Sequence, residues 1–382
     1  MKFIFQIILI TLVSSVISGC TNNQEVKFQD NVLLLNLKHN NYPKKNIKLQ
    51  DFMDIEYIVL DNSDDFICQG NVLDIGKSFI LVSNNTLDGE IFLFDRTGKG
   101  IRKFNHRGEG GKEYRYITDA LLDEERNEIF INDPITRKII VYNLSGEFIR
   151  NLSCQNELLI DEMYNFSSDK LICTLGHGIE TKDKVKFAII SKQDGSILNK
   201  ITIPYEQAKT TQINTPSNMF TIYPYNRMLP FNNNWLLTEA SSDTIFSLSF
   251  NCKKSPFLTR IPSIQTMNPE TFLFLKMLTK RYYFMEVVKK KNNYPKLKLA
   301  YDKQENKIYE YSLYNDDYLN QELVNFTDWK TKDSKIGYWQ KIEAHKLVSL
   351  YEENKLKGNL KNVASTLKET SNAIILLAKE IE

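Results

Sequence analysis

A fourteen-residue stretch that occurs twice constrains the fold of this chain more than any other feature. IFLFDRTGKGIRKF at residues 91–104 is followed 48 residues later by IIVYNLSGEFIRNL at residues 139–152, and the two align without a gap. A weaker third copy, AIISKQDGSILNKI at residues 188–201, places its glycine 49 residues after the glycine of the second. Strand-bearing units at a fixed spacing are typical of repeat folds, in which each unit buries its neighbour.

Each copy predicts a β-hairpin. Apolar, β-branched and aromatic residues fill the first strand, which suits a pleated, half-buried surface. Asp95 or Asn143 then caps the turn with its side-chain oxygen. Gly98 or Gly146 supplies the positive φ that a bulged hairpin needs.

The surroundings of the second copy predict a four-stranded unit, with strands at 116–123, 127–133, 137–143 and 147–152. Four short strands with tight connections at this period are typical of a β-propeller blade. Hydrophobic residues make up 42% of the chain and aromatic residues 12%, which suits a large all-β core. Because roughly 330 residues leave room for about six blades, we predict an all-β fold, a six-bladed β-propeller of four-stranded blades.

The C-terminal region predicts a helical insertion followed by a closing strand. Apolar residues recur at helical spacing between Trp339 and Leu367, so we place helix at about 335–367. The run AIILLAK at 373–379 is continuously apolar, as in a strand buried on both faces. An unpaired strand edge would be a template for aggregation, so a strand at about 372–379 is expected to close the ring. The propeller is assigned residues 46–382.

The N-terminus predicts export. Lys2 is followed by an apolar stretch and then by small residues, which makes residues 1–19 a signal peptide and not a membrane span. Ile17–Ser18–Gly19–Cys20 resembles the bacterial lipobox, and this resemblance implies that Cys20 is lipidated after cleavage. Acyl chains on one residue suffice for membrane anchoring. Residues 20–45 are then a lipidated N-terminus and tether. A plain secretory signal with a chance cysteine is the alternative.

The other four cysteines are Cys68, Cys154, Cys173 and Cys252. Two disulfides could form in an oxidising compartment. We favour buried free thiols, because Cys68 and Cys173 lie in apolar patterns where cysteine behaves as a small hydrophobe.

The lipobox, the tether and residues 106–152 together resemble the six-bladed β-propeller lipoproteins of Bacteroidetes, which are similar to NHL-repeat propellers. The connection in that family reads Gly-x-Gly-Pro-Gly-Glu-Tyr. Gly108, Gly110, Glu113 and Tyr114 match it, whereas Gly111 replaces the proline and Lys112 the third glycine. The resemblance implies an outer-membrane lipoprotein of the cell envelope, facing the periplasm or the surface. Its membrane contact would be the N-terminal lipid.

Propeller geometry predicts where a ligand would bind. The connections from each outer strand to the next inner strand share one face with the loops between second and third strands, and binding residues concentrate on such loops. On this loop face we expect a glycan, a peptide or an envelope protein to bind. The candidate ligand-binding residues are Arg107, Glu109, Tyr114, Arg115, Asp133, His177, Tyr223, Tyr225 and Arg227.

Two classes of function follow. The first is a non-catalytic binding module, expected as a monomer. The second is a propeller enzyme (lyase, lactonase or glycoside-acting hydrolase) with its site at the channel mouth. The chain has four histidines and no HExxH, GxSxG or P-loop motif, so we assign no catalytic residue, no metal site and no cofactor. A net charge of +2 on 382 residues argues against nucleic acid as a partner.

Overall fold

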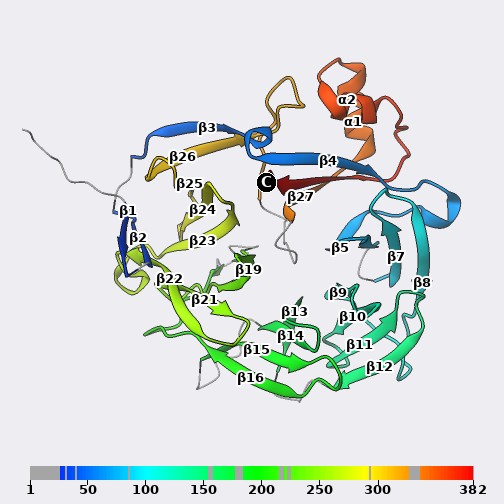
Figure 1. Ribbon diagram of the computed structural model, residues 1–382, viewed down its shortest axis with the longest axis horizontal. Helices are drawn as coiled ribbons and strands as arrows, with labels where there is room; N and C mark the ends of the chain where they lie inside the picture. The colour runs from blue at the N-terminus through cyan, green and yellow to red at the C-terminus, as the bar shows by residue number, and fades with distance from the viewer. Residues whose placement is uncertain are drawn as a thin grey trace, which may run out of the picture.

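The computed structural model describes residues 26–30, 32–38, 41–84, 87–153, 158–176, 184–214, 219–221, 225–291, 294–326 and 336–381. Its sheets form a ring, which Figure 1 shows end-on, and the predicted six-bladed β-propeller is confirmed.

Three consecutive blades have four antiparallel strands each, running from the channel outward. Blade 1 contains β5 (Asn71–Ile75), β6 (Phe79–Ser83), β7 (Glu90–Asp95) and β8 (Gly100–Asn105). Blade 2 contains β9 (Asp119–Asp123), β10 (Glu128–Asp133), β11 (Lys138–Asn143) and β12 (Phe148–Ser153). Blade 3 contains β13 (Ile160–Asn165), β14 (Lys170–Leu175), β15 (Val185–Ser191) and β16 (Ile197–Thr202).

The next two blades are widened by strands from the N-terminus. Blade 4 contains β19 (Met228–Phe231), β20 (Asn234–Leu237), β21 (Thr244–Ser249) and β22 (Lys254–Ile261), with β2 (Val32–Asn36) and β1 (Val26–Gln29) outside them. Blade 5 contains β23 (Thr271–Leu278), β24 (Tyr282–Lys289), β25 (Lys296–Asp302) and β26 (Lys307–Tyr314), with β3 (Lys44–Lys48) outside them. Short 3₁₀ turns lie at η1 (Leu49–Asp51), η2 (Asp64–Phe66) and η3 (Ile264–Thr266).

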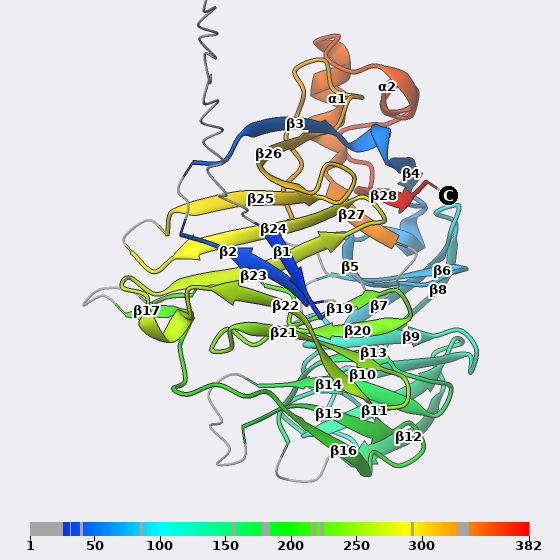
Figure 2. The same ribbon diagram turned by 60° about the vertical axis from the view of Figure 1, so that its left-hand side comes forward.

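The predicted tether is therefore too long. Strand β2 pairs in parallel with β22, and β3 pairs in parallel with β26, as Figure 2 shows. Residues from Val26 onward thus belong to the propeller, although the sequence analysis assigned residues 20–45 to a tether. The outer strands of blades 4 and 5 would otherwise have free edges, and β2 and β3 satisfy their backbone groups.

Blade 6 is built from both ends of the chain. Its described strands are β27 (Ile336–Ile342), β28 (Ile374–Glu380) and β4 (Met53–Val59), in that order, all antiparallel. The predicted closing strand is confirmed as β28. The predicted helical start at about 335 is wrong, because residues 336–342 form β27 and the helices in the described part of this region are α1 (Ala344–Glu352) and α2 (Gly358–Ala364). Pairing with β28 outweighs the helical spacing of Trp339 and Ile342.

The repeated hairpin turns pack each blade against the preceding one. Gly98, Gly146 and Gly195 all have positive φ. A Cβ at Gly146 would lie 2.9 Å from Phe104 of blade 1, and one at Gly195 would lie 3.0 Å from Leu152 of blade 2. A Cβ at Gly98 would overlap the carbonyl oxygen of Val59 in β4. The glycines of the repeat are thus required by the turn and by the contact between blades.

The predicted caps are also present. Asp95 Oδ1 accepts from the backbone N–H of Thr97 at 2.8 Å and of Lys99 at 3.1 Å. Asn143 Oδ1 accepts in the same way from Ser145 and Glu147, at 2.9 Å each. The pairing register shifts within each hairpin, as expected for a bulge.

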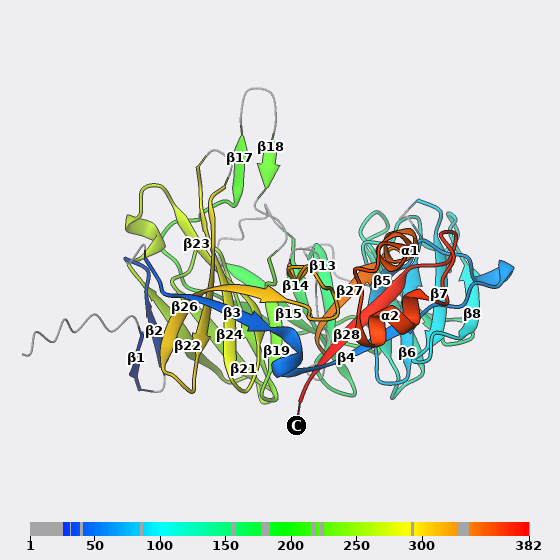
Figure 3. The same ribbon diagram turned by 90° about the horizontal axis from the view of Figure 1, so that it is seen from above.

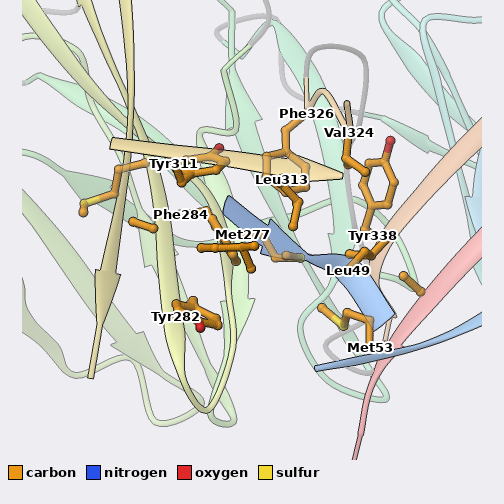
Figure 4. Packing of buried hydrophobic residues seen from close by; sticks show 14 of the residues in the cluster. Leu49, Met53, Met277, Tyr282, Phe284, Tyr311, Leu313, Val324, Phe326 and Tyr338 are labelled. Carbon is orange, nitrogen blue, oxygen red and sulfur yellow. The ribbon is translucent and has the colours of Figure 1, made fainter. Parts of the chain in front are cut away.

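The largest hydrophobic cluster joins blades 4, 5 and 6. Figure 4 shows Leu49 and Met53 from the N-terminal segment lying among side chains of blades 5 and 6. The aromatic rings of Phe284 and Tyr311 lie 5.0 Å apart, centroid to centroid, and those of Phe326 and Tyr338 lie 5.3 Å apart. The N-terminal segment therefore completes the core in addition to closing the ring.

Inner-strand carboxylates join neighbouring blades near the channel. Asp74 Oδ2 accepts from the backbone N–H of Leu122 at 2.7 Å, and Asp119 Oδ2 accepts from that of Met163 at 2.7 Å. Both carboxylates are buried, and each acceptor satisfies a backbone group of the next blade.

The cysteines in the described part of the chain, Cys68, Cys173 and Cys252, are free thiols. Cys173 is buried in β14 as expected, but Cys68 is half-buried outside any strand and Cys252 is exposed. Cys154 lies outside the described residues.

Candidate functional site

The connections from each outer strand to the next inner strand lie on one face of the ring, here called the mouth face. A hairpin of β17 (Gln212–Asn214) and β18 (Met219–Thr221) belongs to the connection from blade 3 to blade 4 and stands out from this face, as Figure 3 shows. Of the predicted site residues, His177 and Tyr223 lie outside the described residues, as does Cys20. The other seven are described.

The glycine-rich connection from blade 1 to blade 2 is folded upon itself. Glu113 Oε2 accepts from the backbone N–H of Gly110 at 2.7 Å, and a Cβ at Gly108 would overlap the same carboxylate. The Gly108 N–H donates to the carbonyl of Tyr114 at 3.0 Å. These glycines have a structural role, since they leave room for a carboxylate that caps the loop.

Tyr114 is a core residue and not a ligand contact, contrary to the prediction. Its side chain is fully buried, and its hydroxyl donates to the carbonyl of Gly89 at 2.6 Å and accepts from the N–H of His106 at 3.0 Å. Burial raises the pKa of its phenol to about 12. Tyr114 thus anchors the connection to blade 1.

Arg115, Glu109 and Arg107 are exposed on the mouth face, as predicted. Arg115 Nη2 lies 3.7 Å from Glu109 Oε1, with 44% and 84% of the two side chains exposed. Asp133, in contrast, is fully buried. Its carboxylate accepts from the backbone N–H of Arg115 at 2.8 Å and of Ile135 at 3.0 Å. Asp133 therefore positions Arg115 and caps the turn after β10, so its predicted ligand contact is wrong.

Tyr225 and Arg227 are buried at the entry to blade 4, so neither presents the exposed side chain that was predicted. The Tyr225 ring stacks on Phe274 with centroids 4.4 Å apart. The Arg227 guanidinium donates to the carbonyls of Leu175 and, at 3.2 Å, of Lys186, both in blade 3.

One further contact brings Arg227 to the mouth face. Its Nη1 lies 3.5 Å from Asp161 Oδ2, and 37% of the Asp161 side chain is exposed. Arg227 Nε has no hydrogen-bond partner among the described residues. Arg227 thus holds blade 3 against blade 4 and also faces a half-exposed carboxylate.

Hydrogen bonds connect these groups along the mouth face. Asn132, beside Asp133, donates to the carbonyl of Ile160 at 2.8 Å, and the next residue is Asp161. Thr238 donates its backbone N–H to the carbonyl of Arg227 at 2.8 Å. The following residue, Glu239, has its Oε2 3.8 Å from Lys186 Nζ.

We call the charged side chains along this path the mouth arc. Its members are Glu109, Arg115, Asp161, Arg227, Lys186 and Glu239. The sequence analysis missed Asp161, Lys186 and Glu239. An alignment of inner strands could have found Asp161, because Asp119 stands at nearly the same place at the start of β9. Lys186 and Glu239 carry no such signal, since only the packing of blade 3 on blade 4 brings them together.

Outside the mouth arc, the described residues offer neither a metal site nor a membrane-spanning helix. No group of three His, Cys, Asp or Glu side chains there is arranged to hold a metal ion. No helix within the described ranges is long and apolar enough to cross a membrane. A cavity of about 250 Å³ lies between Leu37, Lys38 and Tyr42 and side chains of blade 5, and no member of the mouth arc lines it.

Comparison with known proteins agrees with the fold. A family model described as a domain of unknown function, DUF4934, matches residues 34–379. No curated protein matches the chain. The structure is similar to that of a Bacteroides fragilis protein described as exported, with 14% identity and a TM-score of 0.62 over 89% of this chain and 100% of that one.

Two further structures are more distant. A DUF4221 family member from Bacteroides vulgatus has 8% identity and a TM-score of 0.46 over 87% of this chain and 99% of that one. Virginiamycin B lyase from Staphylococcus aureus has 12% identity and a TM-score of 0.36 over 64% of this chain and 74% of that one.

Proposed function

The chain belongs to the DUF4934 family, a domain of unknown function, and we propose that this member is a non-catalytic binding module of the cell envelope. In this proposal the mouth arc binds a charged peptide segment of a partner protein. The similarity to an exported Bacteroides protein supports a location outside the cytoplasm.

The observation that carries the proposal is the looseness of the ion pairs in the mouth arc. Oppositely charged atoms lie 3.7 Å apart in Arg115–Glu109, 3.5 Å apart in Arg227–Asp161 and 3.8 Å apart in Lys186–Glu239. Arg115–Glu109 is an exposed pair, and such a pair contributes only about 0–1 kcal/mol to stability, so a ligand can exchange for either partner at little cost. The other two pairs each contain one side chain that is less than 10% exposed. The rigid blades hold both signs of charge in a fixed order, which favours recognition by complementarity.

A peptide fits this surface better than a neutral glycan does. Peptides carry charges of both signs, as the mouth arc does. Binding of a sugar ring would use the exposed face of an aromatic side chain, but the two predicted aromatic contacts that the structure describes, Tyr114 and Tyr225, are buried. Binding of a glycan but not of a peptide would therefore contradict the proposal.

Binding can be measured with the full chain in a mild detergent against peptide and glycan arrays. For the best peptide, Arg115→Ala and Asp161→Asn should each weaken binding about fivefold, which corresponds to about 1 kcal/mol. Arg102→Ala is the matched control, since Arg102 is exposed on β8, an outer strand. Equal binding by all variants, or binding of glycans alone, would refute the proposal.

The anchor is the second part of the proposal. We propose that Cys20 is lipidated and holds the protein at the outer membrane. Because β1 begins at Val26, the tether would be only residues 20–25, much shorter than the sequence suggested. Cys20→Ser should move the protein from the membrane fraction to the soluble fraction and abolish palmitate labelling. Retention of both properties by Cys20→Ser would exclude the lipid anchor.

A further inference from the structure

Blade 5 contains three lysines around a single glutamate. Lys276 Nζ lies 3.2 Å from Glu286 Oε2, and Lys296 Nζ lies 3.6 Å from Glu286 Oε1. Lys298 is paired with Glu286 in the register of β24 and β25, so its side chain lies on the same face. We call these four residues the lysine cluster. Its positive charges outnumber its negative ones.

Two members of the cluster are withdrawn from water, whereas Lys296 is 40% exposed and Lys298 is half-buried. Only 5% of the Lys276 side chain and 9% of the Glu286 side chain are exposed. The register of β23 shifts between Leu275 and Met277, which places Lys276 in a bulge of the innermost strand. Bulges commonly redirect a side chain next to a functional site. Here the bulged residue is a buried cation.

Of the three lysines, Lys298 has the positive charge that is least neutralised by a carboxylate. Its Nζ donates to Asn325 Oδ1 at 2.7 Å, and the amide carries no charge. Both carboxylate oxygens of Glu286 are already shared with the other two lysines. Burial lowers the pKa of Lys298 and of Lys276. A half-buried cation of this kind is stabilised when an anion comes close.

The inner strand that carries Lys276 contacts the segment that carries Arg227. Asn226 Nδ2 donates to the carbonyl of Lys276 at 3.4 Å, and the next residue along the chain is Arg227. A ligand that contacts Asp161 and Arg227 is therefore next to the inner strand that carries Lys276.

We propose that the lysine cluster is an oxyanion subsite, which binds a carboxylate or phosphate group. The proposal extends the proposed function, because an acidic group of the same peptide would occupy this subsite. Glu286 orients the lysines, and the Lys298 ammonium is the charge that the subsite offers to the ligand. Two or more lysine N–H donors to one oxyanion are charge-assisted hydrogen bonds, which are the stronger kind.

The test uses small anions alone, so it does not depend on finding the peptide. Inorganic phosphate and succinate are titrated into the full chain at low ionic strength, by calorimetry. We expect saturable binding that weakens as salt rises. Lys298→Gln keeps a donor for Asn325 and should weaken binding tenfold or more, whereas Lys307→Gln removes an exposed lysine of the same blade and should leave it unchanged.

Glu286→Gln separates a binding role from a structural one. If the lysines form an oxyanion subsite, removing the competing carboxylate should tighten phosphate binding. If they only neutralise Glu286, phosphate binding is absent in the wild type and the proposal is wrong. A folded Lys298→Gln protein with unchanged affinity, or an equal loss in Lys307→Gln, would also overturn it.

The two proposals can fail separately. Arg115→Ala should retain phosphate binding while it loses peptide affinity. Phosphate binding without any peptide binding would leave the oxyanion subsite intact and refute only the peptide ligand. A preference for phosphate over succinate, measured in the same buffer, would identify the ligand group as a phosphate.

Discussion

Ile374 of β28 is paired with Val59 of β4, so the last strand of the propeller is hydrogen-bonded to a strand from the beginning of the chain. On its other edge, β28 pairs with β27. The final strand thus has a partner on each side and lies in the middle of its sheet. The ring is closed by this pairing and not by a contact between loops.

Deletion of residues 370–382 should open the ring. Ile374, Ile375, Leu376 and Leu377 are buried, and each contributes about 1.5–3 kcal/mol by leaving water. Their sum is comparable with the 5–15 kcal/mol by which a whole domain is stable. We expect insoluble protein or a melting temperature lower by many degrees. Removal of residues 381–382 alone is the control, and a protein lacking 370–382 that melts like the full chain would contradict closure through β28.

Gly98→Ala should destabilise the propeller at the contact between blades 1 and 6. Its φ of 89° costs an L-residue about 1–2 kcal/mol, and the new Cβ would overlap the carbonyl oxygen of Val59. We expect a loss of more than about 2 kcal/mol in the free energy of urea unfolding. Gly111→Ala is the matched control, because a Cβ there has no atom within 4 Å. Equal stability of the two variants would show that the turn is not constrained by β4.

Lys192→Met should leave a buried charge without its partner. Lys192 Nζ lies 2.6 Å from Asp123 Oδ2, and only 2% and 5% of these side chains are exposed. Breaking such a pair typically costs about 3–5 kcal/mol, and this pair joins blade 3 to blade 2. The double variant Lys192→Met/Asp123→Leu should cost less than the sum of the single changes, which a double-mutant cycle in urea would detect. Strict additivity would argue against coupling across the blades.

Asp302→Asn should remove part of the acid sensitivity of folding. Burial alone would raise the pKa of Asp302, but hydrogen bonds from Arg281 and Lys45 outweigh it and lower the pKa to about 2. A carboxyl with a lowered pKa stabilises the fold above its unfolded pKa of about 4, and this contribution disappears as the pH falls through about 2. The wild type should lose on the order of 2 kcal/mol in that window.

The measurement for Asp302 is urea unfolding between pH 5 and pH 2, in about half-unit steps. Asp302→Asn should show a flatter dependence on pH than the wild type. Asp54→Asn, which changes an exposed carboxylate on β4, is the control. If the stability of Asp302→Asn fell between pH 5 and pH 2 as much as that of the wild type, the contact of Lys45 with blade 5 would not depend on this charge.

The repeating part of the fold could be predicted from local sequence patterns. A capping Asp95 or Asn143 and a glycine three residues later specify a turn through contacts within a few residues. The period of these turns then predicts blades, and the apolar run after residue 372 predicts a buried strand. These signals are short-range, so they can be recognised without knowing what lies across the sheet.

Which polar residues face solvent, and which strands pair across the ring, depends on contacts between distant parts of the chain. Tyr and Arg are residue types that often contact ligands. Tyr114 and Arg227 are nevertheless buried, because they form hydrogen bonds with carbonyl groups of neighbouring blades. Strand β27 has helical spacing and is a strand because β28 lies beside it. In the same way, β2 and β3 depend on the free edges of blades 4 and 5. These features result from contacts between residues far apart in the chain. Such contacts outweigh the local preference for helix or strand, because burial and backbone pairing contribute more free energy than intrinsic propensity does.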